Sequence, residues 1–186
     1  MPVADFLFET IMLKKLPRSG YAFLGAGDES VAEHTCSVAL VAWVMSQLEK
    51  DIDALRLISM CLLHDLPETR IGDLNYVQRK YVTAHEEKAV ADAAGDLPFG
   101  EGLKNLITEF NRGETREARL AHDADQLALL LDLKVIADSG HRPADVWMKN
   151  VMGRLQTDLG KSLAKDILGT PSSRWWLENC LGVRDD

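Results

Sequence analysis

Residues 57–73 constrain the fold of this chain more than any other segment. Residues 57–63 are apolar on nearly every side of a helix, which is typical of a helix in the middle of a protein core. The run ends in His64 and Asp65, and ionisable groups at such a place are costly unless they are paired or bind a metal. Pro67 disfavours helical backbone at the residue before it, so the pair lies in the last helical turn. We interpret the segment as the centre of a metal site.

The rest of the chain is predicted to be helical as well, because apolar residues recur at helical spacing and no segment alternates as a strand does. Ser30 and Glu33 match a capping box, which predicts a helix from there to about Lys50 with His34 on its inward face. We therefore expect one all-α domain over residues 1–186, with a motif-bearing core at about 7–140 and C-terminal helices at 145–182 that pack on it or on a partner. The remaining predicted helices cover residues 6–15, 53–65, 76–94, 103–112, 114–139 and 145–168, with a short one at 174–177 and an irregular stretch at 21–28.

Composition excludes several classes of function. The formal net charge of −8 argues against a nucleic-acid polymer or an anionic membrane as a partner. No apolar run approaches the ~20 residues of a membrane span, and the N-terminus lacks the pattern of a signal peptide. Cys36 and Cys61 lie in apolar helical patterns and Cys180 leaves an odd count, so we expect buried free thiols in a reducing cytoplasm.

Four residues on three predicted helices stand next to inward apolar stripes: His34, His64, Asp65 and Asp125. Two imidazoles and two carboxylates can hold a divalent ion and still leave positions for other ligands. Such a set suits Mn, Co, Fe or Mg, and the residues alone do not select among them. Asp123, which shares a helix face with several leucines, is a rival to Asp125.

Three segments add detail to this constellation: Leu-Lys-Lys-Leu-Pro-Arg-Ser-Gly at 13–20, Glu-Ser-Val-Ala-Glu-His-Thr at 29–35 and His-Asp-Leu-Pro-Glu-Thr-Arg-Ile-Gly-Asp at 64–73. With the order His, His-Asp, Asp, they resemble the 5′-deoxynucleotidase branch of the HD-domain metal-dependent phosphohydrolases. The resemblance covers roughly residues 7–133. It implies an HD-domain helical bundle with a metal site in its core, and a homodimer.

The resemblance also implies a role for each matching residue. His34, His64, Asp65 and Asp125 would be the metal ligands, and a second ion could lie at Glu68, Asp73 and the Leu74 carbonyl. The implied catalytic residues are Glu68, which would hold or activate the attacking water, Arg18, which would bind the phosphate, and Asp73, which would contact the sugar. The implied substrate-binding residues are Arg18, Ser19, Asp65, Asp73, Tyr76 and Asp125.

The expected activity is hydrolysis of (deoxy)nucleoside 5′-monophosphates to nucleoside and phosphate. Ser19 stands where a bacterial relative has a tryptophan that excludes the ribose 2′-hydroxyl, so the sugar preference stays open. Tyr21 and Phe23 follow Arg18 closely enough in sequence for a ring to stack on a base. The alternatives are another HD-type hydrolase (a triphosphatase, an alarmone hydrolase or a cyclic-nucleotide diesterase) and a metal-stabilised helical binding protein without turnover.

Overall fold

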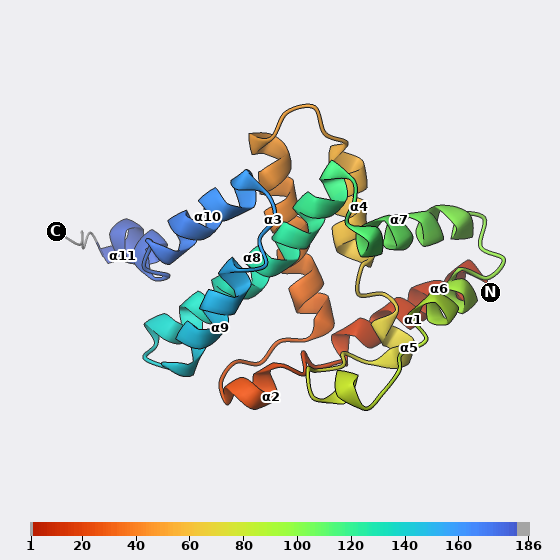
Figure 1. Ribbon diagram of the computed structural model, residues 1–186, viewed down its shortest axis with the longest axis horizontal. Coiled ribbons are helices and arrows are strands. Elements are labelled where there is room, and N and C mark those ends of the chain that lie inside the picture. The colour runs from red at the N-terminus through yellow and green to blue at the C-terminus, as the bar shows by residue number, and fades with distance from the viewer. Residues whose placement is uncertain (1, 182–186) are drawn as a thin grey trace.

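The computed structural model describes residues 2–181, which fold into helices joined by loops (Figure 1). Over these residues there is no β-strand, only one isolated bridge between Pro17 and Ser30, and the all-α prediction is confirmed. The elements are α1 (Val3–Thr10), the 3₁₀ turn η1 (Ile11–Lys14), α2 (Tyr21–Leu24), α3 (Val31–Leu48), α4 (Ala54–Leu63), α5 (Glu68–Ile71), the 3₁₀ turn η2 (Gln78–Lys80), α6 (Glu86–Ala94), α7 (Gly100–Arg112), α8 (Arg116–Asp138), α9 (Pro143–Met152), α10 (Asp158–Leu168) and α11 (Arg174–Leu181).

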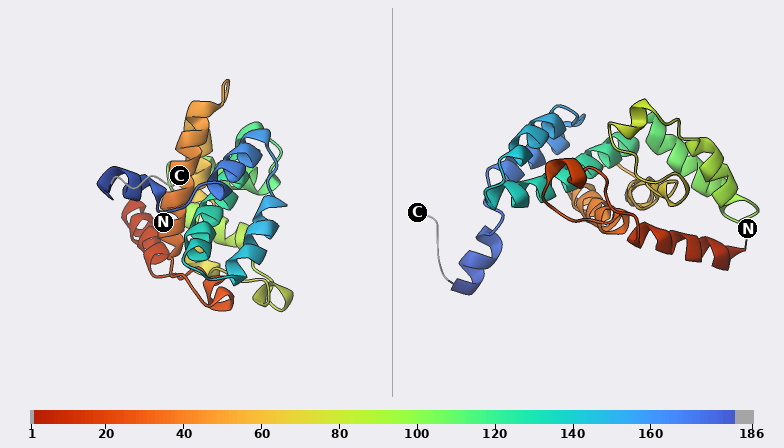
Figure 2. Two further views of the ribbon diagram at one scale, coloured as in Figure 1. Left: turned by 90° about the vertical axis from the view of Figure 1, so that its left-hand side faces the viewer. Right: turned by 90° about the horizontal axis from the view of Figure 1, so that it is seen from below.

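The long helix α8 is the centre of the molecule, and α3, α4, α7, α9 and α10 all pack against it. Leu120, Leu127, Leu130 and Leu133 of α8 are almost completely buried. A smaller apolar cluster lies under α1, α6 and α7, which stand at the opposite end of the molecule from α11 (Figures 1 and 2). The metal-site residues proposed from the sequence therefore belong to the helices with the most extensive packing.

Several predicted helix ends are confirmed, at positions where a side chain caps the helix or a glycine ends it. The Ser30 hydroxyl accepts a hydrogen bond from the Glu33 amide, and the Glu33 carboxylate accepts one from the Ser30 amide, so the capping box is confirmed. Asp53 and Thr115 cap α4 and α8 in the same way. Gly113 ends α7 in the left-handed conformation, with φ of 62°, which a side chain rarely adopts.

The prediction of one helix over residues 76–94 is wrong in its first half. The structure has only η2 there, followed by an extended loop, and the helix begins at Glu86. Every residue from Tyr76 to His85 is exposed, so this stretch offers no apolar face that could be buried. Alanine and valine side chains that reach the core begin only at Ala89.

The predicted helix over residues 145–168 is in fact two helices. The chain breaks between α9 and α10, and Thr157 caps the second helix by accepting a hydrogen bond from the Gly160 amide. The buried Asp123 carboxylate accepts hydrogen bonds from the Gln156 amide at 2.8 Å and the Thr157 amide at 2.8 Å. Val151 and Leu155 are buried as the continuous helix required, so the apolar stripe was correct although the helix is interrupted.

Smaller departures concern the N-terminal half and the thiols. The stretch at 21–28, expected to be irregular, contains the short helix α2. Cys61 is buried as expected, but Cys36 is exposed on the outer side of α3, and Cys180 is exposed too. Among the described residues, no helix has both the length and the apolar character needed to span a bilayer.

Candidate metal centre and substrate cleft

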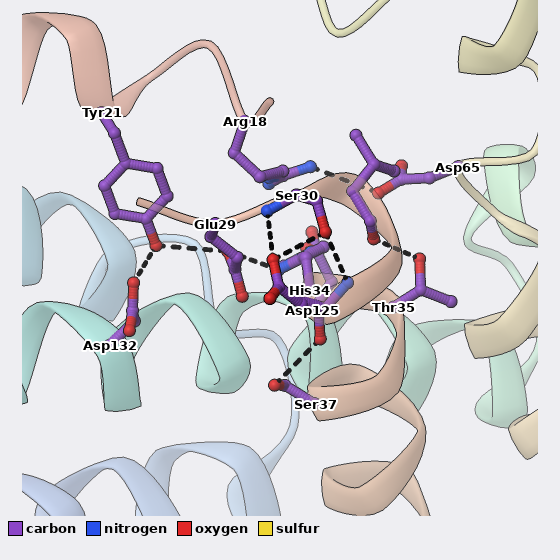
Figure 3. Close-up of polar contacts among 12 residues, drawn as sticks. Arg18, Tyr21, Glu29, Ser30, His34, Thr35, Ser37, Asp65, Asp125 and Asp132 are labelled. Atoms are coloured by element: carbon purple, nitrogen blue, oxygen red, sulfur yellow. Dashed lines mark hydrogen bonds and ion pairs between the residues drawn. The ribbon is translucent and has the colours of Figure 1, made fainter. Parts of the chain in front are cut away.

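His34 and Asp125 meet across the two best-packed helices. The cap at Ser30 starts α3 so that His34, in its first turn, points into the core, where it is completely buried. Its Nε2 atom lies 2.8 Å from Oδ1 of Asp125, which projects from the middle of α8 (Figure 3). The side-chain amide of Gln126 donates a hydrogen bond to Asp125 Oδ2 at 2.8 Å and fixes the second oxygen of that carboxylate.

His64 is held in one tautomer by the end of its own helix. It is the C-terminal cap of α4, and its Nδ1 atom lies 2.8 Å from the Cys61 carbonyl oxygen. A carbonyl oxygen only accepts, so Nδ1 carries the proton and Nε2 keeps a lone pair. Nε2 is buried without a hydrogen-bond partner among the described residues, at 3.2 Å from Asp65 Oδ2. Burial lowers the pKa of His64, but the Asp65 carboxylate outweighs it and raises the pKa, so a metal ion that bound the neutral ring at Nε2 would compete with a proton.

The donor atoms of His34, His64 and Asp125 lie close enough to bind one ion. One donor atom from each of the three residues lies within 4.8 Å of the others. An octahedral ion with ligands at about 2.1 Å has neighbouring donors roughly 3 Å apart, close to the His34–Asp125 separation of 2.8 Å. These three residues therefore fit a divalent cation. Asp65 is not among these three residues; its Oδ2 atom lies 3.2 Å from both Arg18 Nη1 and His64 Nε2.

Behind His34 stands a second row of polar residues (Figure 3). Glu29 Oε2 lies 3.6 Å from His34 Nδ1, and the Tyr21 hydroxyl reaches both Glu29, at 3.2 Å, and Asp132. Burial alone would lower the pKa of His34, but its bonds with Asp125 and Glu29 outweigh burial and raise the pKa to about 9. A carboxylate on the outer nitrogen of an imidazole fixes the ring and increases its basicity towards a metal.

Arg18 reaches the same centre from the loop before α2. Its backbone amide donates to the Glu29 carbonyl at 2.8 Å, which lays this loop against the start of α3. Its guanidinium lies 3.2 Å from Asp65 Oδ2 and 3.9 Å from Asp73 Oδ2. Burial lowers the pKa of Arg18, but the carboxylates of Asp65, Asp73 and Asp125 outweigh it, so the pKa is raised and the charge is retained.

Glu68 and Asp73 come from the turn that follows α4. Glu68 opens α5, and its Oε2 atom is buried with no hydrogen-bond partner among the described residues. Burial first, and then the carboxylates of Asp65 and Asp73, raise the pKa of Glu68 to about 9. Gly72, at φ of 75°, turns the chain so that Asp73 Oδ2 accepts a hydrogen bond from the Ser19 amide at 2.8 Å.

Arg18, Asp65, Glu68, Asp73 and Asp125 line a cleft of about 250 Å³. The cleft contains every residue that the sequence indicated for substrate binding, and Tyr76 is exposed beside it. A second cleft of about 470 Å³ meets the same centre from the side of His64 and His122. The Leu74 carbonyl, one of the candidate ligands for a second ion, accepts a hydrogen bond from Arg79 Nε at 2.7 Å. A second ion at the Leu74 carbonyl would therefore compete with the Arg79 guanidinium for this oxygen.

The sequence patterns did not identify several residues of this region. Glu29 stands inside the segment at 29–35, yet nothing local indicates that it reaches His34. Trp147 and Arg154 line the cleft from the helix pair that was predicted as one helix, so no sequence signal indicated them. Asp123, the alternative to Asp125 as a ligand, instead accepts hydrogen bonds from backbone amides between α9 and α10. Tyr21, considered as a stacking ring, has its hydroxyl bonded to Glu29 and Asp132, and Phe23 does not line the cleft.

Comparison with known proteins agrees with this geometry. Residues 11–167 match a family model described as HD domain. The chain is 26% identical over 172 residues to the 5′-deoxynucleotidase HDDC2 of Dictyostelium discoideum, covering 83% of this chain and 90% of the relative. It is 22% identical over 186 residues to the 5′-deoxynucleotidase hdd1 of Schizosaccharomyces pombe, covering 94% and 93%.

Solved structures share the fold. A protein of Pyrococcus horikoshii superposes with a TM-score of 0.72 at 27% identity, covering 91% of this chain and 98% of that one. A protein of Magnetospirillum magnetotacticum, described as a predicted metal-dependent phosphohydrolase, superposes with a TM-score of 0.70 at 23% identity, covering 93% and 92%. The helical arrangement around the centre is therefore common to all of them.

Proposed function

The chain belongs to the HD-domain family, and on that premise we propose that it is a metal-dependent phosphohydrolase that converts (deoxy)nucleoside 5′-monophosphates to nucleoside and phosphate. The observation that carries the proposal is that Asp125 of the metal-fitting triad, the Arg18 guanidinium and the Glu68 carboxyl line one cleft. The curated relatives named 5′-deoxynucleotidase support the substrate class.

Binding of the phosphate is assigned to the metal ligands and Arg18. A divalent ion held by His34, His64 and Asp125, with Asp65 as the fourth proposed ligand, would supply Lewis-acid chemistry that neutralises charge on the phosphoryl group. The guanidinium of Arg18 is buried beside this centre and keeps its charge. It can donate two parallel hydrogen bonds to phosphoryl oxygens, which favours the in-line geometry of hydrolysis.

The proton transfer is assigned to Glu68 and the sugar contact to Asp73. A divalent ion bound at the centre would favour the ionised form of Glu68, in which Oε2 can receive the proton of the attacking water. Asp73 is anchored through Oδ2 by the Ser19 amide and lines the cleft next to Arg18. Its carboxylate is suited to accept a hydrogen bond from a sugar hydroxyl.

A substrate panel tests the proposal. Purified protein loaded with Mn, Co or Mg is incubated with each deoxynucleoside and ribonucleoside 5′-monophosphate, and phosphate is measured colorimetrically. We expect phosphate and nucleoside in equal amounts from at least the deoxynucleotides. If no deoxynucleotide releases phosphate with any of the three metals, the proposal is contradicted. The ratio of deoxy to ribo rates resolves the sugar preference left open by Ser19.

Other hydrolase activities are distinguished by their products. A triphosphatase or an alarmone hydrolase would release tripolyphosphate or pyrophosphate, and a cyclic-nucleotide diesterase would give a monophosphate; chromatography of the reaction mixtures separates these outcomes. A binding protein without turnover has no use for the buried Glu68.

We also propose that the chain forms a homodimer through the side that carries α1, α3 and α11, which lie along one edge of the molecule (Figure 2). Monomeric proteins rarely expose so much apolar surface on one side. Phe8 is 75% exposed, Leu40 63%, Trp43 55% and Trp175 72%. A second copy of the chain is a suitable cover, because a two-fold contact buries the same patch twice.

Light scattering at micromolar concentration tests the dimer. The wild-type chain is expected to have twice the monomer mass, and Trp43→Glu is expected to be a monomer. Leu55→Glu is the matched control, since Leu55 is 77% exposed and lines a groove between α4 and α7. A monomeric wild type, or a Trp43→Glu variant that stays dimeric, would refute this surface.

We assign the protein to a reducing cytoplasm. The three cysteines are free, and burial raises the pKa of the Cys61 thiol, which keeps it protonated and unreactive. A fluorescent fusion found in an oxidising compartment would contradict this assignment.

A further inference from the structure

The substrate cleft has an apolar end as well as a charged one. It follows α8, where Asp125, Leu129 and Leu133 succeed one another at four-residue steps on one face. With a rise of 1.5 Å per residue, Leu129 stands about 6 Å and Leu133 about 12 Å from Asp125 along the helix. Leu24 of α2 and Trp147 of α9 line the cleft together with these leucines. The cleft therefore has a charged end, lined by Arg18, Asp65 and Asp125, and an aliphatic and aromatic end.

Trp147 lies directly beside the loop that carries Arg18. A β-carbon placed on Gly20 would meet the indole atoms Cη2 and Cζ3 at 3.3 Å, so glycine at this position gives the ring room to approach. Gly20 follows Arg18 and Ser19 in sequence, and its own φ of −61° is ordinary. The need for glycine is therefore one of space. The loop that holds the buried cation and the ring of Trp147 belong to the same wall of the cleft.

The side-chain amides of this cleft are partly engaged by the protein itself, although Gln126 Oε1 is buried without a hydrogen-bond partner among the described residues. The Gln126 side-chain amide donates to Asp125, and the Asn75 side-chain oxygen accepts from the amides of Val77 and Gln78. Reading the edge of a base requires such amides or carboxylates to be available. A flat ring and leucine side chains instead offer surface on which any base can stack.

We propose that Trp147 is the stacking platform for the nucleobase of the substrate, an inference that rests on the proposed function. A nucleoside monophosphate has a dianionic phosphate at one end, a sugar in the middle and a flat apolar base at the other end. The phosphate would lie at Arg18, and the base would lie at Leu133 and Trp147. Binding by stacking makes the enzyme tolerant of base identity. It discriminates strongly against a sugar phosphate that has no base.

The test compares one nucleotide with its base-free counterpart. The kcat/KM values for dAMP and for 2-deoxyribose 5-phosphate are measured with the wild type, Trp147→Ala, Trp147→Leu and Trp147→Phe, after circular dichroism shows that each is folded. Loss of a base–aromatic stack is expected to lower kcat/KM for dAMP on the order of 10- to 100-fold in the Ala and Leu variants, mainly through KM. The value for 2-deoxyribose 5-phosphate should stay within about twofold, and Trp147→Phe should recover most of the loss.

Each outcome decides between stacking and a packing role. An equal fall for both substrates, or no fall for dAMP, would overturn the proposal. Trp147→Leu preserves apolar packing, so it carries the test if Trp147→Ala does not fold. Trp176→Leu, the same change on α11 outside the cleft, should leave the ratio of the two kcat/KM values unchanged.

Failure of the proposed function is recognised separately. In that case the metal-loaded wild type releases no phosphate from either compound. Calorimetric titration of the wild type and Trp147→Leu with dAMP and with 2-deoxyribose 5-phosphate then measures the stack directly. Tighter binding of dAMP that disappears in Trp147→Leu supports the proposal, and equal affinities in the two proteins contradict it.

Discussion

At His64, one backbone carbonyl decides which ring nitrogen carries the proton. The bond from Nδ1 to the Cys61 carbonyl turns Nε2 towards Asp65 and the rest of the centre. Glu29 has the corresponding position behind His34, at 3.6 Å from its Nδ1 atom. The two imidazoles are thus oriented by different means, a helix end for one and a carboxylate from a loop for the other.

Glu68 is predicted to be required for turnover but not for metal binding. Replacement of Glu68 by Gln removes the proton acceptor and should lower kcat by roughly 10²- to 10⁴-fold. Metal content, measured by elemental analysis of the dialysed protein, should stay equal to that of the wild type. Glu101→Gln, a change at an exposed residue of α7, is the control. An active Glu68→Gln enzyme would remove Glu68 from the mechanism.

Glu29 is predicted to act on the metal through His34. Replacement of Glu29 by Gln removes the negative charge that lies 3.6 Å from His34 Nδ1 and should lower the metal affinity about 10- to 100-fold. Isothermal titration of the chelator-treated protein with Mn or Co measures this directly, without reference to activity. Glu87→Gln, at an exposed position of α6, should bind as the wild type does. Unchanged affinity in Glu29→Gln would show that His34 is oriented by packing alone.

At the scale of elements, the joint between α9 and α10 has the largest consequence for the cleft. Asp123 bonds to the amides of Gln156 and Thr157 and so sets where α10 begins. The break sits beside Arg154, which lines the cleft together with Trp147 of α9. The buried carboxylate that looked like a rival metal ligand is therefore what organises the helix pair forming one wall of the cleft.

Asp123→Ala is predicted to destabilise the fold. It leaves the amides of Gln156 and Thr157 without their acceptor, and we expect the free energy of unfolding to fall by about 3 kcal/mol. Urea denaturation followed by circular dichroism measures the change. Asp145→Ala, at an exposed position of α9, should fall within about 0.5 kcal/mol of the wild type. A similarly small effect at Asp123 would mean that water replaces the carboxylate.

At the scale of the whole molecule, the candidate metal centre joins helices that are distant in sequence. α3, α4 and α8 each contribute to it, and all three pack on one another. An ion bound there would cross-link the helices that make up the main core. Metal binding should therefore be coupled to the stability of the entire fold rather than to one loop.

Removal of the metal is predicted to lower the melting temperature. An ion at about 100 times its dissociation constant stabilises the folded state by about 2.7 kcal/mol, which corresponds to roughly 5–10 °C for a chain of this size. Differential scanning calorimetry with and without a chelator measures the shift. His64→Ala should melt at one temperature regardless of metal. A wild type that does not respond to chelation would contradict a core metal site.

The sequence by itself determined the helical class, most helix boundaries and the residue types at the centre. These features depend on short-range rules: apolar spacing, the cap at Ser30, the turn glycine at Gly113 and the placement of His64 and Asp65 at a helix end. Each is decided within a few residues of the chain. The sequence overpredicted helix at 76–85, where spacing alone did not reveal that no core is available to pack against.

Only the tertiary structure decided which groups meet. The approach of Glu29 to His34, of Asp123 to the α9–α10 joint and of Trp147 to Gly20 involves residues whose contacts depend on how helices cross and how loops close. Such crossings result from the packing of many side chains at once, so no local pattern encodes them. For the same reason the charged end of the cleft was foreseeable from motifs, while its apolar end emerged only from the fold.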